Sequence, residues 1–341
     1  MDNTSWQLKL FSELPIDDLI AFNNAMYPHK PKYNAESLIW RFRVGFDPKI
    51  EPIYLLIDEK IVGQAGLIPN HIVMKDTHAI AIWFNKFIVS NQLQGQGFGK
   101  ILTQRWMELT NIHITNCNDQ SMQVFKKYGW EEEFSSARFA RPIHLKNVAK
   151  SKDWKGLKLS IASIATPFYQ IMLHGYCLFS KQLQIQSLSK NTAQTLLPYF
   201  KQISNNYLVK DEQWIQWRLL SGPLAKEYYI IRYHDAAIIF RHFEYHTSKR
   251  IHVVYQTLYS SEQENKILLK SLLQFALKNK VDLIWAFTNI PHLKNSYQHI
   301  LSNTISTRFA FHTQDPETMS MFHTNPIPLQ SVDSDYDSMY V

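Results

Sequence analysis

A short run of glycines carries the clearest chemical signal in the sequence. Residues 94–100 read QGQGFGK. β-Forming residues precede this run and residues with helical spacing follow it, so the sequence predicts a strand over 83–89, a turn, and a helix from Phe98. The first amides of a helix lack intrahelical acceptors, and glycine lets the backbone approach an anion closely. The pattern therefore predicts a phosphate-binding turn.

Three kinds of phosphate-binding loop have glycines near this spacing. A P-loop requires Ser or Thr after its Gly-Lys pair, but Ile101 follows Gly99 and Lys100. A dinucleotide-binding loop requires the pattern GxGxxG, and here Lys100 stands in place of the last glycine. The pattern that remains is Gln94-x-x-Gly97-x-Gly99.

That pattern resembles the acyl-CoA pyrophosphate loop of the GNAT (Gcn5-related N-acetyltransferase) superfamily, which reads Gln or Arg, two residues, Gly, one residue, then Gly or Ala. A second segment, NDQSMQVFKKYGW at 118–130, resembles the superfamily's Asn-x-x-Ala-x-x-x-Tyr-x-Lys-x-Gly-Phe helix. The resemblance covers residues 1–140. It implies an α/β (α+β) fold in which a mixed, mostly antiparallel sheet is flanked by helices.

The resemblance also implies an acyl-CoA site. Backbone groups of Phe87, Ile88 and Val89 would pair with pantetheine like an extra strand, and an amide near Val89 would polarise the thioester carbonyl. The glycine turn would hold the pyrophosphate, and the 118–130 helix would form the far wall. The implied cofactor-binding set is Phe87, Ile88, Val89, Gln94, Gly95, Gln96, Gly97, Phe98, Gly99, Lys100, Asn118, Ser121 and Phe125.

The implied reaction is attack of a neutral amine on the thioester of acetyl-CoA or another acyl-CoA, with no metal. An alkyl ammonium group has a pKa of ~10.4 and must first lose a proton. The strand positions that often supply an acid hold Asn85 and Lys86, and the helix position that often supplies a tyrosine holds Phe125. The catalytic residues are therefore left unassigned, with Asn85 and Tyr128 as candidates. Tyr128 is also explained as a core tyrosine, and Cys117 is interpreted as a packed thiol.

Length and a faint internal repeat predict two domains. The 341 residues exceed one ordinary compact domain, and 45% of them are apolar, so each half can bury a core. Trp40-Arg41 matches Trp217-Arg218, and two strand-like runs follow each pair. The segment matching the loop in the second half, 257–280, has no glycine and carries acids that would repel phosphate. We expect a GNAT acyl-CoA-binding domain over 1–145, a connector with an apolar helix over 146–190, and a degenerate GNAT-like domain over 191–341.

The apolar part of the connector, 159–179, is long enough to cross a bilayer, but Pro167 and several polar residues interrupt it. We expect a buried connector helix between the domains, with a helix resting on a membrane surface as the alternative. The start of the chain lacks the basic and apolar regions of a secretory signal, and two cysteines provide no disulfide framework. These features predict a cytoplasmic protein with no transmembrane segment.

The charge pattern and two short motifs limit the partners. The net charge of +7 is spread along the chain without a nucleic-acid-binding signature, and an anionic cofactor such as CoA accounts for it. His242, Glu244 and His246 share one face of a strand and are interpreted as a polar face rather than a metal site. Residues 333–337, DSDYD, lack the rest of a calcium loop and are interpreted as a solvated acidic tail.

Three functions fit the sequence. The first is N-acyl transfer to a primary amine of a small molecule. The Trp-Arg pairs and the Asp-Ser-Asp run resemble tandem GNAT-like proteins of bacterial surface-polysaccharide assembly, which makes an amino sugar or sugar nucleotide the first acceptor to test. The second is a non-catalytic acyl-CoA-binding or scaffold protein, which the missing acid and base favour. The third is N-acetylation of a protein or peptide.

Overall fold

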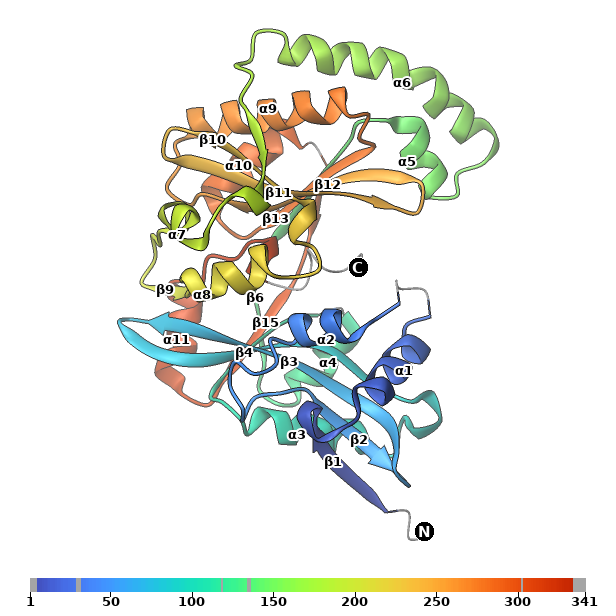
Figure 1. Ribbon diagram of the computed structural model, residues 1–341, viewed down its shortest axis with the longest axis vertical. Helices are drawn as coiled ribbons and strands as arrows, with labels where there is room; N and C mark the ends of the chain where they lie inside the picture. Colours follow the sequence, from blue (N-terminus) through green and yellow to red (C-terminus); the bar gives the residue numbers. More distant parts are fainter. Residues whose placement is uncertain (1–4, 29–31, 118, 134–135, 302, 334–341) are drawn as a thin grey trace.

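Two mixed sheets, stacked along the long axis of the molecule, form the framework of the protein (Figure 1). The computed structural model describes residues 5–28, 32–117, 119–133, 136–301 and 303–333. Within these ranges each sheet has a single parallel strand pair, β4 with β5 and β12 with β13, and its other pairs are antiparallel. Helices cover both sheets, so the predicted fold class is confirmed.

The first sheet has the order β1-β2-β3-β4-β5-β15-β6, with β9 added beside β3. Its strands are β1 (Trp6–Leu10), β2 (Ile53–Ile57), β3 (Lys60–Met74), β4 (Thr77–Val89), β5 (Ile112–Asn116), β6 (Glu131–Glu133), β9 (Asn206–Leu208) and β15 (Phe309–Thr313). Side chains alternate across this sheet. Trp83 packs with α1 (Ile16–Met26) and α2 (Ala35–Arg41), whereas its neighbour Phe84 packs with α3 (Phe98–Met107) and α4 (Asp119–Lys126).

The second sheet has the order β8-β10-β11-β12-β13-β7-β14. Its strands are β7 (Ala137–Pro142), β8 (Ile185–Ser187), β10 (Tyr228–Tyr233), β11 (Ala236–Tyr245), β12 (Ser248–Gln256), β13 (Leu283–Thr288) and β14 (Asn303–Ser306). The remaining helices are α5 (Leu145–Ser151), α6 (Gly156–Cys177), α7 (Ala193–Leu196), α8 (Glu212–Ile215), α9 (Glu262–Lys278), α10 (Pro291–Ile300) and α11 (Pro316–Thr324). Helices α9 and α10 pack on one face of this sheet, and α7 and α8 pack on the other.

The two sheets exchange one strand each. Counted from β1 and from β8, the two orders correspond strand for strand, but the sixth place in each sheet holds a strand from the other half. β7 pairs with β13 and β14, and β15 pairs with β5 and β6. The domain limits at 145/146 and 190/191 are drawn along the sequence and remain a proposal. In space, β7 precedes the first limit but belongs to the second sheet, and β15 follows the second limit but belongs to the first sheet.

The two matched Trp-Arg pairs meet each other where the halves join. The indole Nε1 of Trp40 donates to the carbonyl of Trp217 at 2.8 Å, and Nε1 of Trp217 donates to the carbonyl of Trp40 at 2.8 Å. The guanidinium carbon of Arg218 lies 5.0 Å from the Trp40 ring centroid. This reciprocal contact, together with the matching strand orders, confirms the tandem arrangement.

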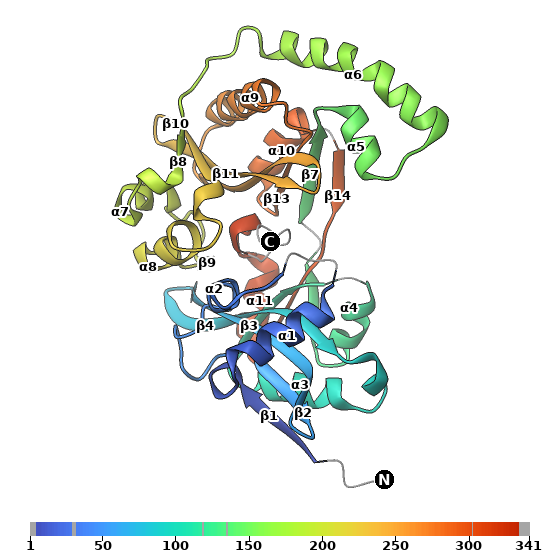
Figure 2. The same cartoon turned by 45° about the vertical axis from the view of Figure 1, so that its right-hand side comes forward.

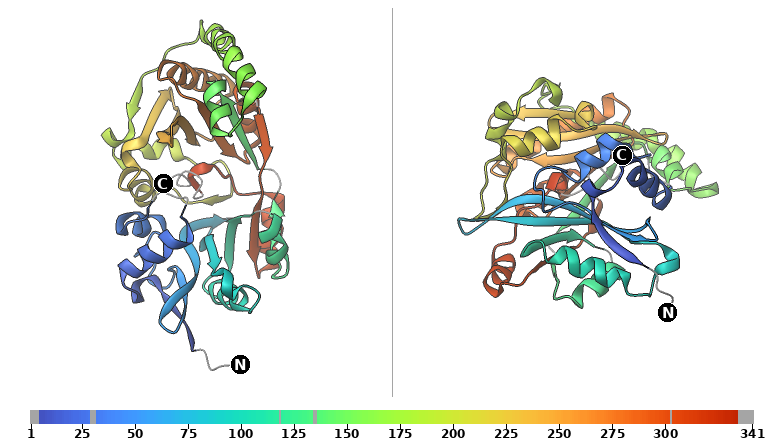
Figure 3. Two further views of the ribbon diagram at one scale, coloured as in Figure 1. Left: turned by 90° about the vertical axis from the view of Figure 1, so that its right-hand side faces the viewer. Right: turned by 60° about the horizontal axis from the view of Figure 1, so that its bottom comes forward.

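Helix α6 lies elsewhere than expected. It packs against α5 and α9 on the outer edge of the second half, far from the first sheet (Figures 2 and 3). Ala162, Thr166, Leu173 and Cys177 are buried, while the apolar side chains on the opposite face are exposed. The expectation of a buried helix between the domains is therefore wrong, because the second half covers one of the two apolar faces. Among the described residues, no helix has both the length and the apolar character needed to cross a bilayer.

Candidate functional site

The parallel pair of the first sheet opens into a gap. β4 and β5 are in register from Ala81 and Ile112 to Phe84 and Thr115, and the described residues pair no further. The Thr115 hydroxyl donates to the Phe84 carbonyl at 2.7 Å and closes the paired stretch. β4 then continues to Val89 against β3 alone. One edge of β4 is thus left without a strand beside it.

A bulge in β4 sets which backbone groups face the gap. Gln64 of β3 pairs with Ile88, and Gly66 pairs with Asn85, so β4 holds one extra residue. The Ser90 amide donates to the Val62 carbonyl at 2.8 Å. By alternation along the strand, Ile88 turns its backbone groups toward β3, while Phe87 and Val89 turn theirs toward the gap. Contact of Phe87, Ile88 and Val89 with a cofactor stays a prediction, and the backbone geometry favours Phe87 and Val89.

The glycine turn at the end of the gap presents free amides. Gly95 and Gly97 have φ angles of 82° and 90°, and Gly97 caps α3. Within the described part of the chain, the amides of Gly95, Gly97, Phe98 and Gly99 have no hydrogen-bond acceptor. A Cβ atom added at Gly95 or Gly97 would meet nothing within 4 Å. Free amides, open space and the positive end of a helix are the features that favour an anion at a helix start.

Side chains of the same turn add donors around these amides. Gln94, Gln96 and Lys100 are exposed. The side-chain Nε2 of Gln94 donates to Oδ1 of Asn91 at 2.9 Å, and Nε2 of Gln96 donates to the Gln92 carbonyl at 3.1 Å. Both glutamine side chains therefore stabilise the turn itself. Of the predicted set, Lys100 has the charged side chain, and its ammonium could pair with a phosphate.

The far wall of the gap comes from α4 and its flanks. Phe125 is buried, with its ring centroid 4.8 Å from that of Trp130 and 5.8 Å from that of Phe84, so it supports the wall from beneath. Ser121 and Tyr128 are half-buried, and Asn118 lies outside the described residues. Burial raises the pKa of the Cys117 thiol to about 11, which keeps it protonated and agrees with a packed thiol.

Three buried carboxamides surround the gap on the α1–α2 face. Gln64, Asn85 and Asn116 fall on this face by strand alternation, since Ile68, Trp83 and Ile114 pack there. Both polar side-chain atoms of each carboxamide are buried and have no hydrogen-bond partner among the described residues. Each unmet amide costs about 1–3 kcal/mol, so these three are candidates for contact with a polar ligand.

Of these three residues, Asn85 is predicted from the sequence, and Gln64 and Asn116 are not. The signal was available for Asn116, which follows the last residue of β5 that pairs with β4, just as Asn85 follows the last residue of β4 that pairs with β5. Polar residues at the carboxyl ends of neighbouring parallel strands mark ligand sites in α/β sheets. Gln64 had no such signal, because its position beside the bulge depends on the register of β3.

Lys86, at the bulge, lines the same side. It has a φ angle of 47°, and its ammonium lies 3.7 Å from the ring centroid of Tyr33 and 4.9 Å from that of Tyr27. It also donates to the Tyr33 hydroxyl. The position that often holds an acid thus carries a cation held by two tyrosines of the α1–α2 segment.

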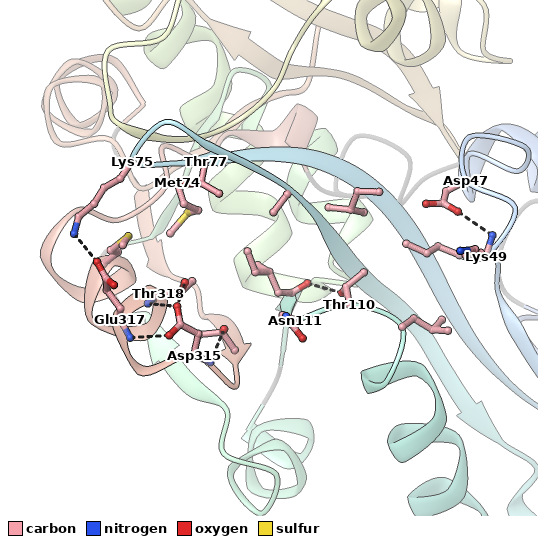
Figure 4. Close-up of a pocket in the computed structure, with 17 residues that line it drawn as sticks. Asp47, Lys49, Met74, Lys75, Thr77, Thr110, Asn111, Asp315, Glu317 and Thr318 are labelled. Carbon is pink, nitrogen blue, oxygen red and sulfur yellow. Dashed lines mark hydrogen bonds and ion pairs between the residues drawn. The ribbon is translucent and has the colours of Figure 1, made fainter.

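A cavity lies at the other end of β4 (Figure 4). It measures about 750 Å³ and is bounded by the β3–β4 hairpin, the turn before β5 and α11. Three of its charged groups are engaged within the chain: Lys75 pairs with Glu317 at 3.2 Å, and Asp315 caps α11 by accepting from the Thr318 amide at 3.0 Å. Because it lies at the amino ends of β4 and β5, away from the free amides, it is the weaker candidate.

Comparison with known proteins identifies the fold. No protein-family model and no curated protein matches the sequence. Among solved structures, Saccharomyces cerevisiae N-myristoyltransferase with bound myristoyl-CoA matches 92% of this chain and 84% of its own at 12% identity and a TM-score of 0.58. GCN5-related N-acetyltransferases from Kribbella flavida and Anabaena variabilis match 92% and 90% of this chain and 72% of their own, at 12% identity and TM-scores of 0.57 and 0.55. At this identity the likeness shows the fold, two GNAT-like domains in tandem.

Proposed function

Starting from this tandem GNAT fold, we propose that the protein is an acyl-CoA-dependent N-acyltransferase acting on a primary amine of a small molecule. The observation that carries the proposal is the pair of features in the first half: a strand edge left open between β4 and β5, and four free amides where that opening ends. The cofactor would be acetyl-CoA or another acyl-CoA, and the reaction would take place in the cytoplasm.

The chain's own groups would hold two parts of the cofactor, the pyrophosphate and pantetheine. The amides of Gly95, Gly97, Phe98 and Gly99, with Lys100 beside them, would hold the pyrophosphate. Pantetheine would lie along the open edge of β4, bonded to the backbone of Phe87 and Val89. The yeast neighbour holds myristoyl-CoA, which supports an acyl-CoA as co-substrate.

Positioning would supply much of the catalysis. The unmet carboxamide oxygens of Asn85 and Asn116 would accept N–H bonds from the neutral amine and leave its lone pair directed at the thioester carbon. The new N–C bond forms and the C–S bond breaks; the amine nitrogen releases one proton to solvent, and the CoA thiolate takes up a proton from solvent or from Tyr128. An amino sugar or sugar nucleotide is the first acceptor to try.

Replacing Asn85 with leucine separates a ligand-binding amide from a structural one. Because the Asn85 amide has no partner in the described structure, Asn85→Leu should leave the melting temperature unchanged or higher while it raises KM for the amine about tenfold or more. Asn289 is the matched control, since its amide bonds to Leu329 and Ile327 at 2.7 and 2.8 Å. Asn289→Leu should destabilise the protein and leave KM for the amine unchanged. Loss of stability in Asn85→Leu with KM unchanged would overturn the assignment.

A second candidate is a non-catalytic acyl-CoA-binding protein. The observation that favours it is Lys86, a cation held between tyrosines at a position where a base is common. Amine-dependent release of free CoA from acetyl-CoA distinguishes the two. Turnover that rises with amine concentration supports the transferase, whereas acyl-CoA uptake without release under any amine supports the binding protein. Turnover with peptides alone would instead support a peptide acceptor.

A further inference from the structure

Helix α6 carries a continuous apolar face that nothing in the described chain covers. Leu157, Ile161, Ile164, Phe168 and Ile171 recur at intervals of four and three residues, so they form one stripe along the helix. Their exposed fractions run from 57% to 76%. The stripe continues through Met172 to Leu178 and Phe179 beyond the end of the helix, all exposed. Monomeric proteins rarely expose so long an apolar surface without a use for it.

The helix is fixed in this orientation. The opposite face is buried on the second half, and the Thr166 hydroxyl accepts from the amide of Lys146 in α5 at 3.0 Å. The Arg141 guanidinium donates to the Tyr169 hydroxyl at 3.3 Å. Turning the stripe inward would break these contacts and expose Leu173 and Cys177. The stripe therefore faces outward permanently.

The surroundings of the stripe are basic. Residues 146–181 contain six lysines, at 146, 150, 152, 155, 158 and 181, and one acid, Asp153. Five of these lysines precede or begin α6, beside the exposed indole of Trp154. An exposed apolar stripe with an aromatic residue and lysines beside it is the arrangement of helices that lie in the interface of an anionic membrane.

We propose that the outward face of α6 docks this protein onto a membrane surface containing anionic lipids. The apolar stripe would enter the boundary between headgroups and acyl chains, and the lysines would pair with lipid charges. A second copy of the chain is the poorer partner, because its α6 region carries the same six lysines and a single acid, so it offers little negative charge to pair with them. The described helix is unable to span the bilayer, so it would lie flat on it.

This docking is independent of the acyl-CoA site. Helix α6 and helix α3 lie at opposite ends of the long axis of the molecule (Figure 1). A bound membrane would leave the glycine turn facing water. Changes in α6 should therefore alter vesicle binding and leave acyl-CoA uptake as it is, so the two proposals fail separately.

Flotation of the full chain with vesicles tests the proposal. We expect it to float with vesicles of 70% phosphatidylcholine and 30% phosphatidylglycerol, and much less with pure phosphatidylcholine. The double change Ile164→Glu and Phe168→Glu should lower vesicle binding at least tenfold with an unchanged melting temperature. The matched control is Ile203→Glu, which alters an isoleucine 52% exposed outside α6 and should float like the unaltered protein.

The lysines give a second, separate readout. Lys152→Gln with Lys155→Gln should weaken binding to the anionic vesicles about fivefold for each lysine removed and leave binding to neutral vesicles unchanged. Three results would overturn the proposal: no flotation of the unaltered chain with either vesicle, equal flotation of the Ile164/Phe168 variant, or a lipid-free dimer that Phe168→Glu converts to monomer. The last result would make the stripe an interface between copies of the chain.

Discussion

The same strand–turn–helix unit occurs in both halves, but its helix start is used differently. In the first half, Gly97 opens α3 and the first amides stay free. In the second half, Ser261 opens α9, its hydroxyl accepts from the Glu264 amide at 3.2 Å, and its own amide donates to the Glu264 carboxylate at 2.9 Å. The bonds from Ser261 hold the pKa of Glu264 below its usual value. The start of α3 therefore leaves amides free that could bind an anion, whereas the start of α9 is already bonded to a carboxylate of its own chain.

The strand gaps differ in the same way. In the second half, β12 and β13 stay in register as far as Val253 and Ala286. Beyond that point the side chain of Gln330 fills the space, accepting from the Gln256 amide at 2.7 Å and donating to the Gln256 carbonyl at 2.8 Å. Gln330 therefore makes the kind of bonds proposed for pantetheine in the first half. We infer that the second domain has kept the fold and closed its cofactor site.

Blocking the open helix start should have the largest effect. Gly97→Val puts a branched side chain in front of the free amides and should weaken acyl-CoA binding about 100-fold or more, the loss of two bonds to a charged group. Gly45→Val is the control, because Gly45 has a φ angle of 87° and equally open surroundings. Both variants should lose similar stability, and calorimetry should find normal acyl-CoA affinity in the control. Equal affinity in both would remove the distinction between the halves.

Crowding the contact between the two halves should have the second-largest effect. A Cβ atom at Gly222 would lie 2.2 Å from the Trp40 indole nitrogen, so Gly222→Ala should destabilise the protein by about 2–3 kcal/mol. Gly175→Ala in α6 meets nothing within 4 Å and should be neutral or slightly stabilising. Urea unfolding of the two variants measures the difference. Equal urea midpoints for the two variants would mean that the contact between the two tryptophans does not stabilise the joining of the halves.

Each half also buries a neutral histidine. Burial and the neighbouring His312 lower the pKa of His113 to about 3, and burial holds the pKa of His252 well below its usual value. The unfolded chain binds these protons first, so stability is complete above pH ~6.5 and falls by about 1.4 kcal/mol per pH unit for each histidine below it. Urea unfolding at pH 7, 6 and 5 should show this slope, and His113→Phe should reduce it. A slope unchanged by that substitution would contradict the burial of a neutral His113 ring against His312 of β15.

Removing the negative charge from the occupied helix start should have the smallest effect. Glu264→Gln weakens the cap of α9 and should cost about 1 kcal/mol. It should create no second acyl-CoA site, because Gln330 still fills the gap beside Gln256. Thermal unfolding and an acyl-CoA titration check the two outcomes. A second bound acyl-CoA would show that charge alone, and not the filled gap, closes the second domain.

Local features of this fold could be predicted from the sequence, and features built from distant segments could not. The strand, glycine turn and helix from β4 to α3 follow from β-forming residues, glycine spacing and apolar periodicity, all within thirty or so residues. The exchange of β7 and β15 depends on which sheet edge each strand meets, which no local pattern encodes. The unmet amide of Gln64 is likewise defined by what surrounds it, whereas Asn116 did have a sequence signal, at the carboxyl end of a parallel strand. The position of α6 was misjudged because apolar residues on both faces of a helix favour burial, and only the structure reveals which face is covered.

Titration of the full chain with acetyl-CoA, or with a longer acyl-CoA if acetyl-CoA fails, tests the central claim most directly. The account predicts one bound acyl-CoA per chain, lost in Gly97→Val and kept in Gly45→Val. Binding of no acyl-CoA, binding of two, or binding of one that survives Gly97→Val would contradict it.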